Sequence, residues 1–289
     1  MKTPKRIQPL IEEGLVDTVI CELMSGKEAT VYMVRCGEEF RCAKVYKKSD
    51  QRNFRQTTNY TEGRRIKNSR YERVIKRGSR FGRSTQEEAW QSTEVDMLYR
   101  LANAGVHVPQ PYNFFESVLL MELISNDRGD IAPRLNDIQP TAKQARLYHR
   151  VLIRQIVRML CAGVVHGDLS QYNILIGDQG PVIIDLPQAV DAARNSNAQQ
   201  MIKRDIDNLT AYLSRFAPEL SQTDFGSEIW SLYQCGNLHE SVSLTGQMHK
   251  KEAPVNVNKV LKTIGAVLKK EAARQRYKQE RWTSPYSQC

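Results

Sequence analysis

Residues 165–175 read Val165-His166-Gly167-Asp168-Leu169-Ser170-Gln171-Tyr172-Asn173-Ile174-Leu175, and Val182-Ile183-Ile184-Asp185 follows shortly after them. They are the most informative stretch of the chain. Asn173 comes five residues after Asp168, and Asp185 comes twelve residues after Asn173. Asp and Asn are also common turn residues. Because each lies at the end of an apolar run, we expect a shared polar site rather than three unrelated turns.

The spacing of these three residues is typical of kinase folds, which place a catalytic carboxylate and two magnesium ligands around a nucleoside triphosphate. Asp168 is the expected general base or hydroxyl-orienting carboxylate. Asn173 and Asp185 offer hard oxygen ligands, the type that magnesium prefers. His166 is expected to pack below this loop in a structural role. The expected cofactors are therefore ATP and Mg²⁺, with Mn²⁺ as an alternative ion.

Two residues of the first half complete the expected phosphate site. Lys44 lies in the apolar strand Cys42-Ala43-Lys44-Val45-Tyr46, from which it could pair with the α- and β-phosphates. Exposed lysines are common in strands, so Lys44 alone is a weak signal. Glu94 lies in the middle of the helix expected in the first half and could hold Lys44 by an ion pair. Glu88 is the alternative partner, and a solvated helix face is the other interpretation of Glu94.

The segment Ser25-Gly26-Lys27-Glu28-Ala29-Thr30-Val31 has the position of a phosphate-covering hairpin between the first two strands. It has one glycine and therefore does not match the G-x-G-x-x-G pattern of protein kinases. Backbone N–H groups from Gly26 to Ala29, with the Ser25 hydroxyl, could still bind phosphate oxygens. An ordinary hairpin turn is the alternative interpretation.

Two differences from typical protein kinases concern regulation. Gly167 replaces the arginine that precedes the catalytic aspartate in the His-Arg-Asp form and reads a phosphorylated activation loop. Asp185-Leu186-Pro187-Gln188 stands where Asp-Phe-Gly would be, and no Ala-Pro-Glu signature follows it. The sequence therefore predicts an enzyme that is not switched by loop phosphorylation.

Hydrophobic periodicity predicts an α+β, bilobal, protein-kinase-like fold with a small β-rich first lobe (1–123) and a reduced helical second lobe (124–289) that lacks an activation segment. A long, partly disordered basic insertion is expected at 50–84. Expected strands cover 16–22, 29–34, 41–46, 112–115, 117–123, 174–176 and 182–184. Expected helices cover 87–104, 141–162, 198–215, 225–236 and 255–280. The apolar positions of the 141–162 helix include Leu147, Val151 and Ile156.

Composition describes an ordinary globular chain of 289 residues with 40% hydrophobic and 26% charged residues. No apolar run reaches the length of a membrane span, and the basic start lacks a signal-peptide core. Six scattered cysteines without a C-x-x-C pair predict reduced, mostly buried thiols, with neither a zinc site nor a disulfide framework. We therefore expect a cytoplasmic protein with no membrane partner.

The net charge of +10 is concentrated in two segments. Residues 41–83 hold 15 Lys or Arg against 3 Asp or Glu, and residues 250–281 hold 10 against 3. This asymmetry predicts an extended acidic partner, such as RNA, for segments 41–83 and 250–281. A solvated basic loop without a partner is the alternative.

Taken together, the motifs resemble the RIO family of atypical serine/threonine protein kinases. The resemblance spans roughly residues 16–215. It rests on Ser25-Gly26-Lys27-Glu28-Ala29-x-Val31-Tyr32, Ala43-Lys44-Val45, Trp90-x-x-x-Glu94, Gly105-Val106-x-Val108-Pro109-x-Pro111, Met121-Glu122, Ala132-Pro133-x-Leu135, His166-Gly167-Asp168-Leu169-Ser170-x-Tyr172-Asn173 and Ile184-Asp185-x-Pro187-Gln188.

The resemblance implies that ATP phosphates bind under Ser25–Val31 and Lys44, and that adenine binds at a hinge near Glu122 and Ile124. It also implies that Asp168 is catalytic, that Asn173 and Asp185 bind the metal, and that Asp185 could itself accept the γ-phosphate in an ATPase-like cycle. Family members of eukaryotes and archaea serve small-subunit ribosome maturation. This chain departs from one branch in having about fifteen residues before its first expected strand, too few for a winged-helix domain, and it has a longer basic insertion than expected.

Three alternative functions are consistent with this set of residues. The first is an ATP- and Mg-dependent protein kinase or autokinase that docks on RNA or a ribonucleoprotein. The second is a small-molecule phosphotransferase, because aminoglycoside- and choline-kinase-like enzymes share the His-Gly-Asp-Leu-x-x-x-Asn-Ile-Leu loop. The third is a nucleotide-gated factor that binds an RNA particle. The protein phosphoacceptor is not specified by the sequence.

Overall fold

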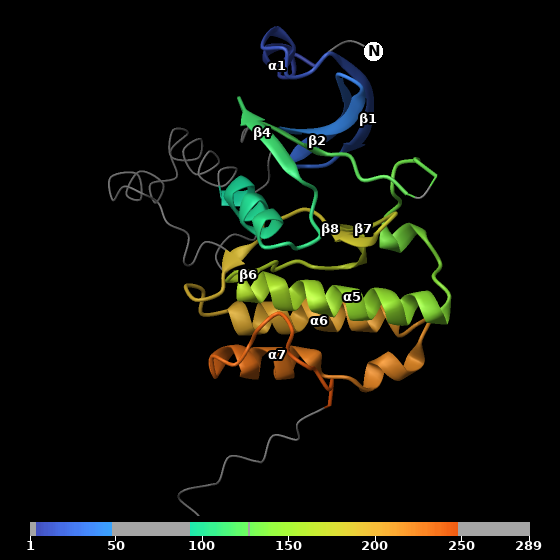
Figure 1. Cartoon of the computed structure of the whole chain (residues 1–289), viewed down its shortest axis with the longest axis vertical. Helices are drawn as coiled ribbons and strands as arrows, with labels where there is room; N and C mark the ends of the chain where they lie inside the picture. Colours follow the sequence, from blue (N-terminus) through green and yellow to red (C-terminus); the bar gives the residue numbers. More distant parts are fainter. Residues whose placement is uncertain (1–3, 48–92, 127, 248–289) are drawn as a thin grey trace, which may run out of the picture. The chain divides into compact units, whose positions relative to one another are not determined.

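The computed structural model describes residues 4–47, 93–126 and 128–247; the insertion expected at 50–84 and the helix expected at 255–280 lie outside these ranges. A five-stranded antiparallel sheet has the order β1-β2-β3-β5-β4 (Figure 1). Its strands are β1 (Thr18–Ser25), β2 (Ala29–Cys36), β3 (Glu39–Tyr46), β4 (Pro111–Phe115) and β5 (Val118–Glu122). Because β3 is central, its backbone is hydrogen-bonded on both sides, to β2 and to β5.

The two faces of this sheet differ in what they bury. Helix α1 (Gln8–Glu12) supplies Leu10 to an apolar cluster that also contains Ala43 and Val45 of β3. Successive side chains of a strand point to opposite faces. Lys44, between Ala43 and Val45, therefore projects from the opposite face of the sheet, away from the cluster that includes α1.

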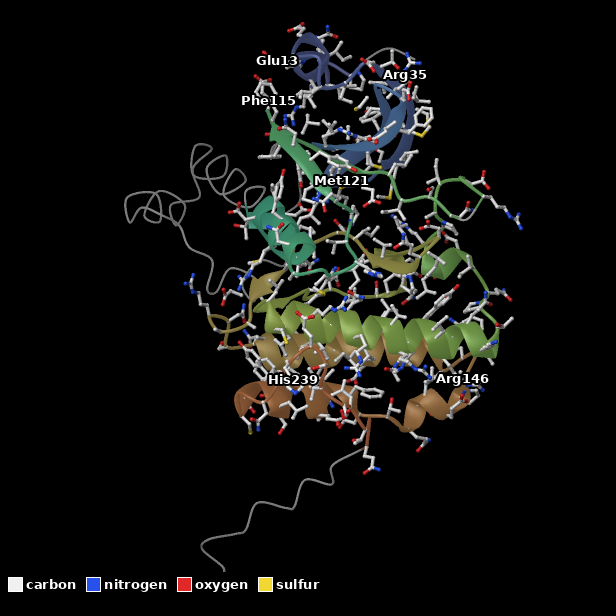
Figure 2. The ribbon with its side chains drawn as sticks, in the orientation of Figure 1. Glu13, Arg35, Phe115, Met121, Arg146 and His239 are labelled. Carbon is white, nitrogen blue, oxygen red and sulfur yellow. The ribbon has the colours of Figure 1, made fainter. Side chains whose placement is uncertain are left out.

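The helical part contains α5 (Ala142–Cys161), α6 (Ala198–Leu213) and α7 (Phe225–Gln234), which lie in successive layers in Figure 1. Thr141 and Gln144 form a capping box at the start of α5, which fixes where this helix begins. At the same end of α5, Arg146, which is labelled in Figure 2, is paired with Glu219 of the 3₁₀ helix η4 (Pro218–Gln222).

Short elements between α5 and α6 carry the polar motif. The 3₁₀ helix η3 (Gln171–Asn173) precedes the hairpin of β7 (Ile174–Gly177) and β8 (Gly180–Ile183). A second antiparallel pair joins β6 (Val164–Val165) to β9 (Val190–Asp191). Only residues 186–197 separate Asp185 from α6, so the chain has no room there for an extended activation segment.

The helix that carries Glu94 is described over residues 93–103, and its C-terminal end is fastened to the helical part. Arg100 lies 3.5 Å from the Asp191 carboxylate. Gly163 has φ of +72°, and a Cβ added there would come within 2.6 Å of the Arg100 guanidinium. Just after the helix, Arg158 of α5 donates to the Gly105 carbonyl at 2.9 Å. These contacts fasten the C-terminal end of the helix to α5 and to the β6–β9 pair.

Most expected elements are confirmed within the described residues, with ends shifted by a few positions, and α1, β6 and β9 were not predicted. Two expectations are wrong. Leu147 is 51% exposed and does not belong to the buried face of α5. The described cysteines are free thiols, but only Cys42 among them is buried, whereas Cys161 and Cys235 are exposed. The predicted boundary between 123 and 124 stays a prediction, because residues 4–247 belong to one compact unit.

Within the described ranges, no helix combines the length and the apolar character that crossing a bilayer requires.

Candidate active site

Lys44 connects two carboxylates from distant parts of the sequence. Its Nζ lies 2.6 Å from Oε1 of Glu94 and 3.1 Å from Oδ1 of Asp185. Only 9% of Lys44 is exposed. Burial acts to lower the pKa of the Lys44 ammonium, but the Glu94 and Asp185 carboxylates outweigh it and raise that pKa well above its usual value. Lys44 is therefore a fixed positive charge at neutral pH.

Glu94 is buried, with 6% of the residue exposed, and Lys44 neutralises it. A buried carboxylate needs such a partner, because its desolvation is otherwise costly. Of the two glutamates weighed from the sequence, the structure places Glu94 against Lys44, and Glu88 lies outside the described residues. Tyr46 lies on the same face of β3, with the Lys44 Nζ 5.4 Å from its ring centroid.

Asp185 follows the apolar β8 strand and adopts a left-handed backbone conformation, with φ of +67°. Residues other than glycine adopt such values infrequently, and they persist where surrounding contacts fix them, often at functional sites. The Lys44 ammonium lowers the pKa of the Asp185 carboxyl, while burial opposes the shift. Asp185 is thus held as an anion directed at Lys44, as a metal-binding carboxylate requires.

The loop around Asp168 is anchored from below by Asp205 of α6. The Gly167 N–H donates to Asp205 Oδ2 at 2.8 Å, and the Leu169 N–H donates to Oδ1 at 3.0 Å. Only 2% of Asp205 is exposed, and burial raises the pKa of its carboxyl. Gly167 has φ of +81°, a conformation that glycine adopts without strain. One buried carboxylate therefore fixes the backbone on both sides of Asp168.

Asp205 was missed in the sequence, although a signal exists. It follows Met201 and Ile202 and precedes Ile206 and Leu209, so it lies on the buried face of an amphipathic helix. An aspartate in that position must find hydrogen-bond partners inside the protein.

His166 has the structural role that the sequence suggested. The ring is 2% exposed, and its Nε2 lies 3.1 Å from the Ile184 carbonyl, while Nδ1 lies 3.3 Å from the Asp168 N–H. A carbonyl only accepts and a backbone N–H only donates, so these contacts require hydrogen on Nε2 and a lone pair on Nδ1. His166 thereby ties the loop to the residue that precedes Asp185.

Asp168 itself presents an exposed side chain. Its Oδ2 accepts a hydrogen bond from Gln188 Nε2 at 3.1 Å. Burial raises the pKa of the Asp168 carboxyl, and the neighbouring Asp185 adds to the rise, while His166 and Arg204 act in the opposite direction. The structure therefore gives Asp168 the exposure that a residue acting on an incoming hydroxyl needs.

Asn173 and Asp185 have the donor chemistry for a divalent ion. The Asn173 Nδ2 donates to the Asp168 carbonyl at 2.8 Å, so the amide oxygen does not take part in this contact and is the atom that could bind an ion. Magnesium is commonly held by one or two protein oxygens together with phosphate oxygens. Among the described residues there is no group of three or more His, Cys, Asp or Glu that could hold a metal by itself. This donor set fits an ion that arrives with a nucleotide.

The expected phosphate loop is the connection between β1 and β2. Ser25 Oγ lies 3.2 Å from the Thr30 hydroxyl, and the Gly26 N–H donates to the Ala29 carbonyl at 2.9 Å. Lys47, which the sequence interpretation did not include, donates from Nζ to Ser25 Oγ at 3.1 Å and to the Gly26 carbonyl at 2.8 Å. The Lys47 ammonium is thus hydrogen-bonded to this loop.

The remaining loop residues lie on either side of this contact. Lys27 is exposed and Glu28 is half-buried at the tip, while Ala29 is buried. Val31 lies directly across from Lys44 in the ladder between β2 and β3. The segment Ser25–Val31 therefore ends at the residue opposite Lys44, which is where a phosphate-covering segment would need to be.

The expected hinge leaves β5 at Glu122. The Glu122 carboxylate accepts from the Gln110 N–H at 3.0 Å, so it is engaged by its own sheet. Ile124 is 8% exposed, and its carbonyl accepts from the Ala132 N–H at 3.0 Å. A Cβ at Gly177 would come within 2.9 Å of Ile124 Cγ2, which shows how closely the hinge approaches the β7–β8 hairpin.

Known proteins provide a family assignment. The family model described as the RIO domain matches residues 30–225. The "RIO-type serine/threonine-protein kinase Rio1" of Haloferax volcanii is 33% identical over 211 residues, covering 72% of this chain and 68% of that protein. The protein of the same name from Thermoplasma acidophilum is 31% identical, covering 65% of this chain and 92% of that protein. The human "Serine/threonine-protein kinase RIO1" is 28% identical, with 71% of this chain but only 35% of the human protein covered.

A crystal structure of a kinase domain aligns with 70% of this chain and 65% of its own, at 13% identity and a TM-score of 0.43, a likeness too low to carry an argument. The family assignment rests instead on the extent of the domain match and on the archaeal relatives. The chain belongs to the RIO family of serine/threonine-protein kinases.

Proposed function

We propose that this chain transfers the γ-phosphoryl group of Mg²⁺-ATP to a serine or threonine hydroxyl. The observation that carries the proposal is the Lys44 ammonium, which is shared by Glu94 and Asp185. Phosphoryl transfer depends mainly on positioning and charge neutralisation. A buried, permanently charged ammonium beside a metal-binding carboxylate supplies both.

In the proposed reaction, Lys44 pairs with phosphate oxygens and the loop from Ser25 to Val31 covers them. Adenine binds at the hinge near Glu122 and Ile124. Asn173 and Asp185 would hold Mg²⁺, which would supply positive charge to neutralise the phosphates. Asp168 accepts the hydroxyl proton as the new P–O bond forms and the bond to the β-phosphate oxygen breaks, which releases ADP.

Label transfer tests this proposal. The chain is incubated with Mg²⁺ and γ-labelled ATP, with casein as a generic acceptor, and the same assay is run on Asp168→Asn. General-base assistance contributes about 10²–10⁴ in rate, so we expect a loss of that size. Equal transfer by the variant would contradict the assignment of Asp168. No transfer and no hydrolysis by the wild type, under conditions where it is folded, would contradict the proposed function.

The destination of the phosphate separates the related activities. Label that is stable in acid indicates a phosphorylated hydroxyl, whereas label released by hydroxylamine indicates an acyl phosphate on Asp185. Slow hydrolysis that RNA stimulates would favour the nucleotide-gated factor. The names of the relatives favour a protein acceptor over the small alcohols used by aminoglycoside- and choline-kinase-like enzymes.

We also propose that the basic segments 41–83 and 250–281 bind RNA or a ribonucleoprotein, and that the protein works in the reducing cytoplasm. Charge is the support for the first statement, since most of both segments lies outside the described residues. Binding through phosphate contacts should weaken steeply with added salt, and salt-insensitive binding would contradict it.

The free thiols of the described cysteines support the proposal that the protein works in the reducing cytoplasm.

A further inference from the structure

We propose that Gln188 is a positioning residue for Asp168: its side-chain amide holds Asp168 Oδ2, so that Oδ1 is presented to the acceptor hydroxyl. This inference rests on the phosphotransfer function proposed above. It starts from the hydrogen bond between Gln188 Nε2 and Asp168 Oδ2, at 3.1 Å. The two residues are 20 positions apart in the sequence, so their contact is a product of the fold.

The Asp168 side chain needs such a partner because it is exposed, and the contacts that fix its backbone do not fix its carboxylate. Asp205 holds the Gly167 and Leu169 N–H groups, and Asn173 donates to the Asp168 carbonyl. These contacts fix the Cα but leave the carboxylate free to rotate about two side-chain bonds. The hydrogen bond from Gln188 acts on the carboxylate itself.

The turn that presents Gln188 is held at both ends. Leu186 is 3% exposed and Ala189 is 1% exposed, and the Ala189 N–H donates to the Leu186 carbonyl at 3.0 Å. Pro187 occupies the second position of this four-residue turn, where its restricted φ is favourable. Gln188 takes the third position, so buried neighbours determine where its amide points.

An amide has the right chemistry for this task. Its NH₂ group donates to a carboxylate without adding charge. A lysine at position 188 would bring a second ammonium beside Asp185 and compete with the metal. A glutamate would set two carboxylates against each other and favour rotation of Asp168 away from its position. Because Gln188 lies three residues after Asp185, one backbone segment carries both the metal-binding carboxylate and the group that orients the base.

The kinetic test uses side chains of similar length without the donor. Gln188→Met and Gln188→Glu are compared with wild type and with Gln179→Met, a matched change at an exposed glutamine in the β7–β8 turn. Misplacing a catalytic group by about 1 Å can cost roughly 10²-fold. We expect kcat to fall about 10- to 100-fold in Gln188→Met and further in Gln188→Glu. The KM for ATP should stay within about twofold, because Gln188 does not contact Lys44. Gln179→Met should match wild type.

A kcat for Gln188→Met equal to that of Gln179→Met would overturn the proposal, because methionine keeps a side chain of similar length and removes the amide that donates to Asp168. Equal losses in kcat and in ATP affinity would also overturn it, because they would indicate a collapsed site rather than a misdirected base.

A spectroscopic arm does not depend on activity. In ¹⁵N-labelled protein, the side-chain amide protons of Gln188 should differ in chemical shift from those of exposed Gln179, and Asp168→Ala should remove that difference. A Gln188 signal that does not respond to Asp168→Ala overturns the inference whether or not phosphotransfer is observed. An intact Gln188 signal in a protein that transfers no phosphate would instead contradict the proposed function.

Discussion

Lys44 and Asp185 are 141 positions apart in the sequence, yet the Lys44 ammonium lies 3.1 Å from the Asp185 carboxylate. The contact joins the central strand of the sheet to a residue two positions beyond the end of β8. It forms on the face of β3 opposite the cluster containing α1, because Ala43 and Val45 take the other face. The strand alternation thus determines which side of the sheet carries the phosphate chemistry.

Replacing this lysine should affect activity and stability by separable routes. Lys44→Met should lower phosphotransfer by about 10²–10³, the range for losing one preorganised electrostatic group. It should also destabilise the fold by about 3–5 kcal/mol, because Glu94 is left buried without a partner. Lys143→Met, at an exposed position of α5, serves as the control.

The double variant Lys44→Met/Glu94→Gln separates the two effects. We expect its denaturant midpoint to recover toward wild type while phosphotransfer stays low. Recovery of activity along with stability would show that Lys44 acts through folding alone.

Asp205→Asn should loosen the catalytic loop. Asparagine offers one acceptor oxygen where two N–H groups, of Gly167 and Leu169, need acceptors. One buried donor is then unsatisfied, at a cost of about 1–3 kcal/mol. We expect a lower melting temperature and a reduced kcat. Asp207→Asn, on the exposed face of α6, should change neither, and an Asp205→Asn protein as stable and active as Asp207→Asn would exclude the anchoring role.

His149 should make stability fall in mild acid. It is 3% exposed, its Nε2 lies 2.9 Å from the Thr210 hydroxyl, and burial lowers the pKa of its imidazole to about 4. The unfolded chain, with the usual pKa near 6.5, binds the proton more readily, so the native state loses stability as pH falls from about 6.5 to about 4. The linked loss is roughly 3 kcal/mol across that window. Above about pH 6.5 the contribution is fully present and constant.

His149→Gln removes the titrating group while keeping a nitrogen able to reach Thr210. Urea unfolding of this variant at several pH values should show a smaller decline between about pH 6.5 and 4 than wild type does. An unchanged slope would mean that other groups cause the acid destabilisation.

Gly163→Ala should impair the enzyme more than an equally strained glycine replacement elsewhere. Gly163 and Gly37 have φ of +72° and +64°, so alanine costs about 1–2 kcal/mol at either position. A Cβ at Gly37 meets no atom within 4 Å, whereas at Gly163 it meets the Arg100 guanidinium. We expect similar losses of stability, but a lower kcat only in Gly163→Ala. Arg100 and Glu94 lie on the same helix. Equal activity of the two variants would show that the position of Arg100 does not affect how Glu94 holds Lys44.

From the sequence it was possible to predict the helices and strands whose apolar residues recur at a regular spacing. It was also possible to propose site residues whose charged side chains interrupt apolar segments. The α5 helix was predicted within one residue at each end, because its apolar spacing is regular. Lys44, Asp168 and Asp185 were proposed as site residues because their apolar neighbours made these charged side chains conspicuous in the sequence. The sequence left Glu88 and Glu94 as alternatives because both lie on one predicted helix, and the 2.6 Å contact with Lys44 identifies Glu94 as a partner.

Other features left a weaker signal in the sequence. α1 has five residues, too few to show a period, and β6 and β9 have two each, which only tertiary pairing stabilises. Lys47 resembles any lysine after a strand until its contacts with Ser25 and Gly26 are known. Leu147 matched the apolar pattern of α5, yet it is exposed to solvent. Which face of the helix is buried depends on the elements that pack against it, and the sequence of the helix alone does not show them.

The contacts of Arg100 restrict how Glu94 can move. At its C-terminal end the helix is fastened through Arg100 to Asp191, and the backbone beyond it to Arg158. Glu94 lies six residues, nearly two turns, before Arg100 on the same helix and is held by the Lys44 ammonium. The described part of this helix is therefore fixed at two points, to β3 through Glu94 and to Asp191 through Arg100. It acts as a rigid spacer whose length sets how far the phosphate-binding strand lies from the β6–β9 pair.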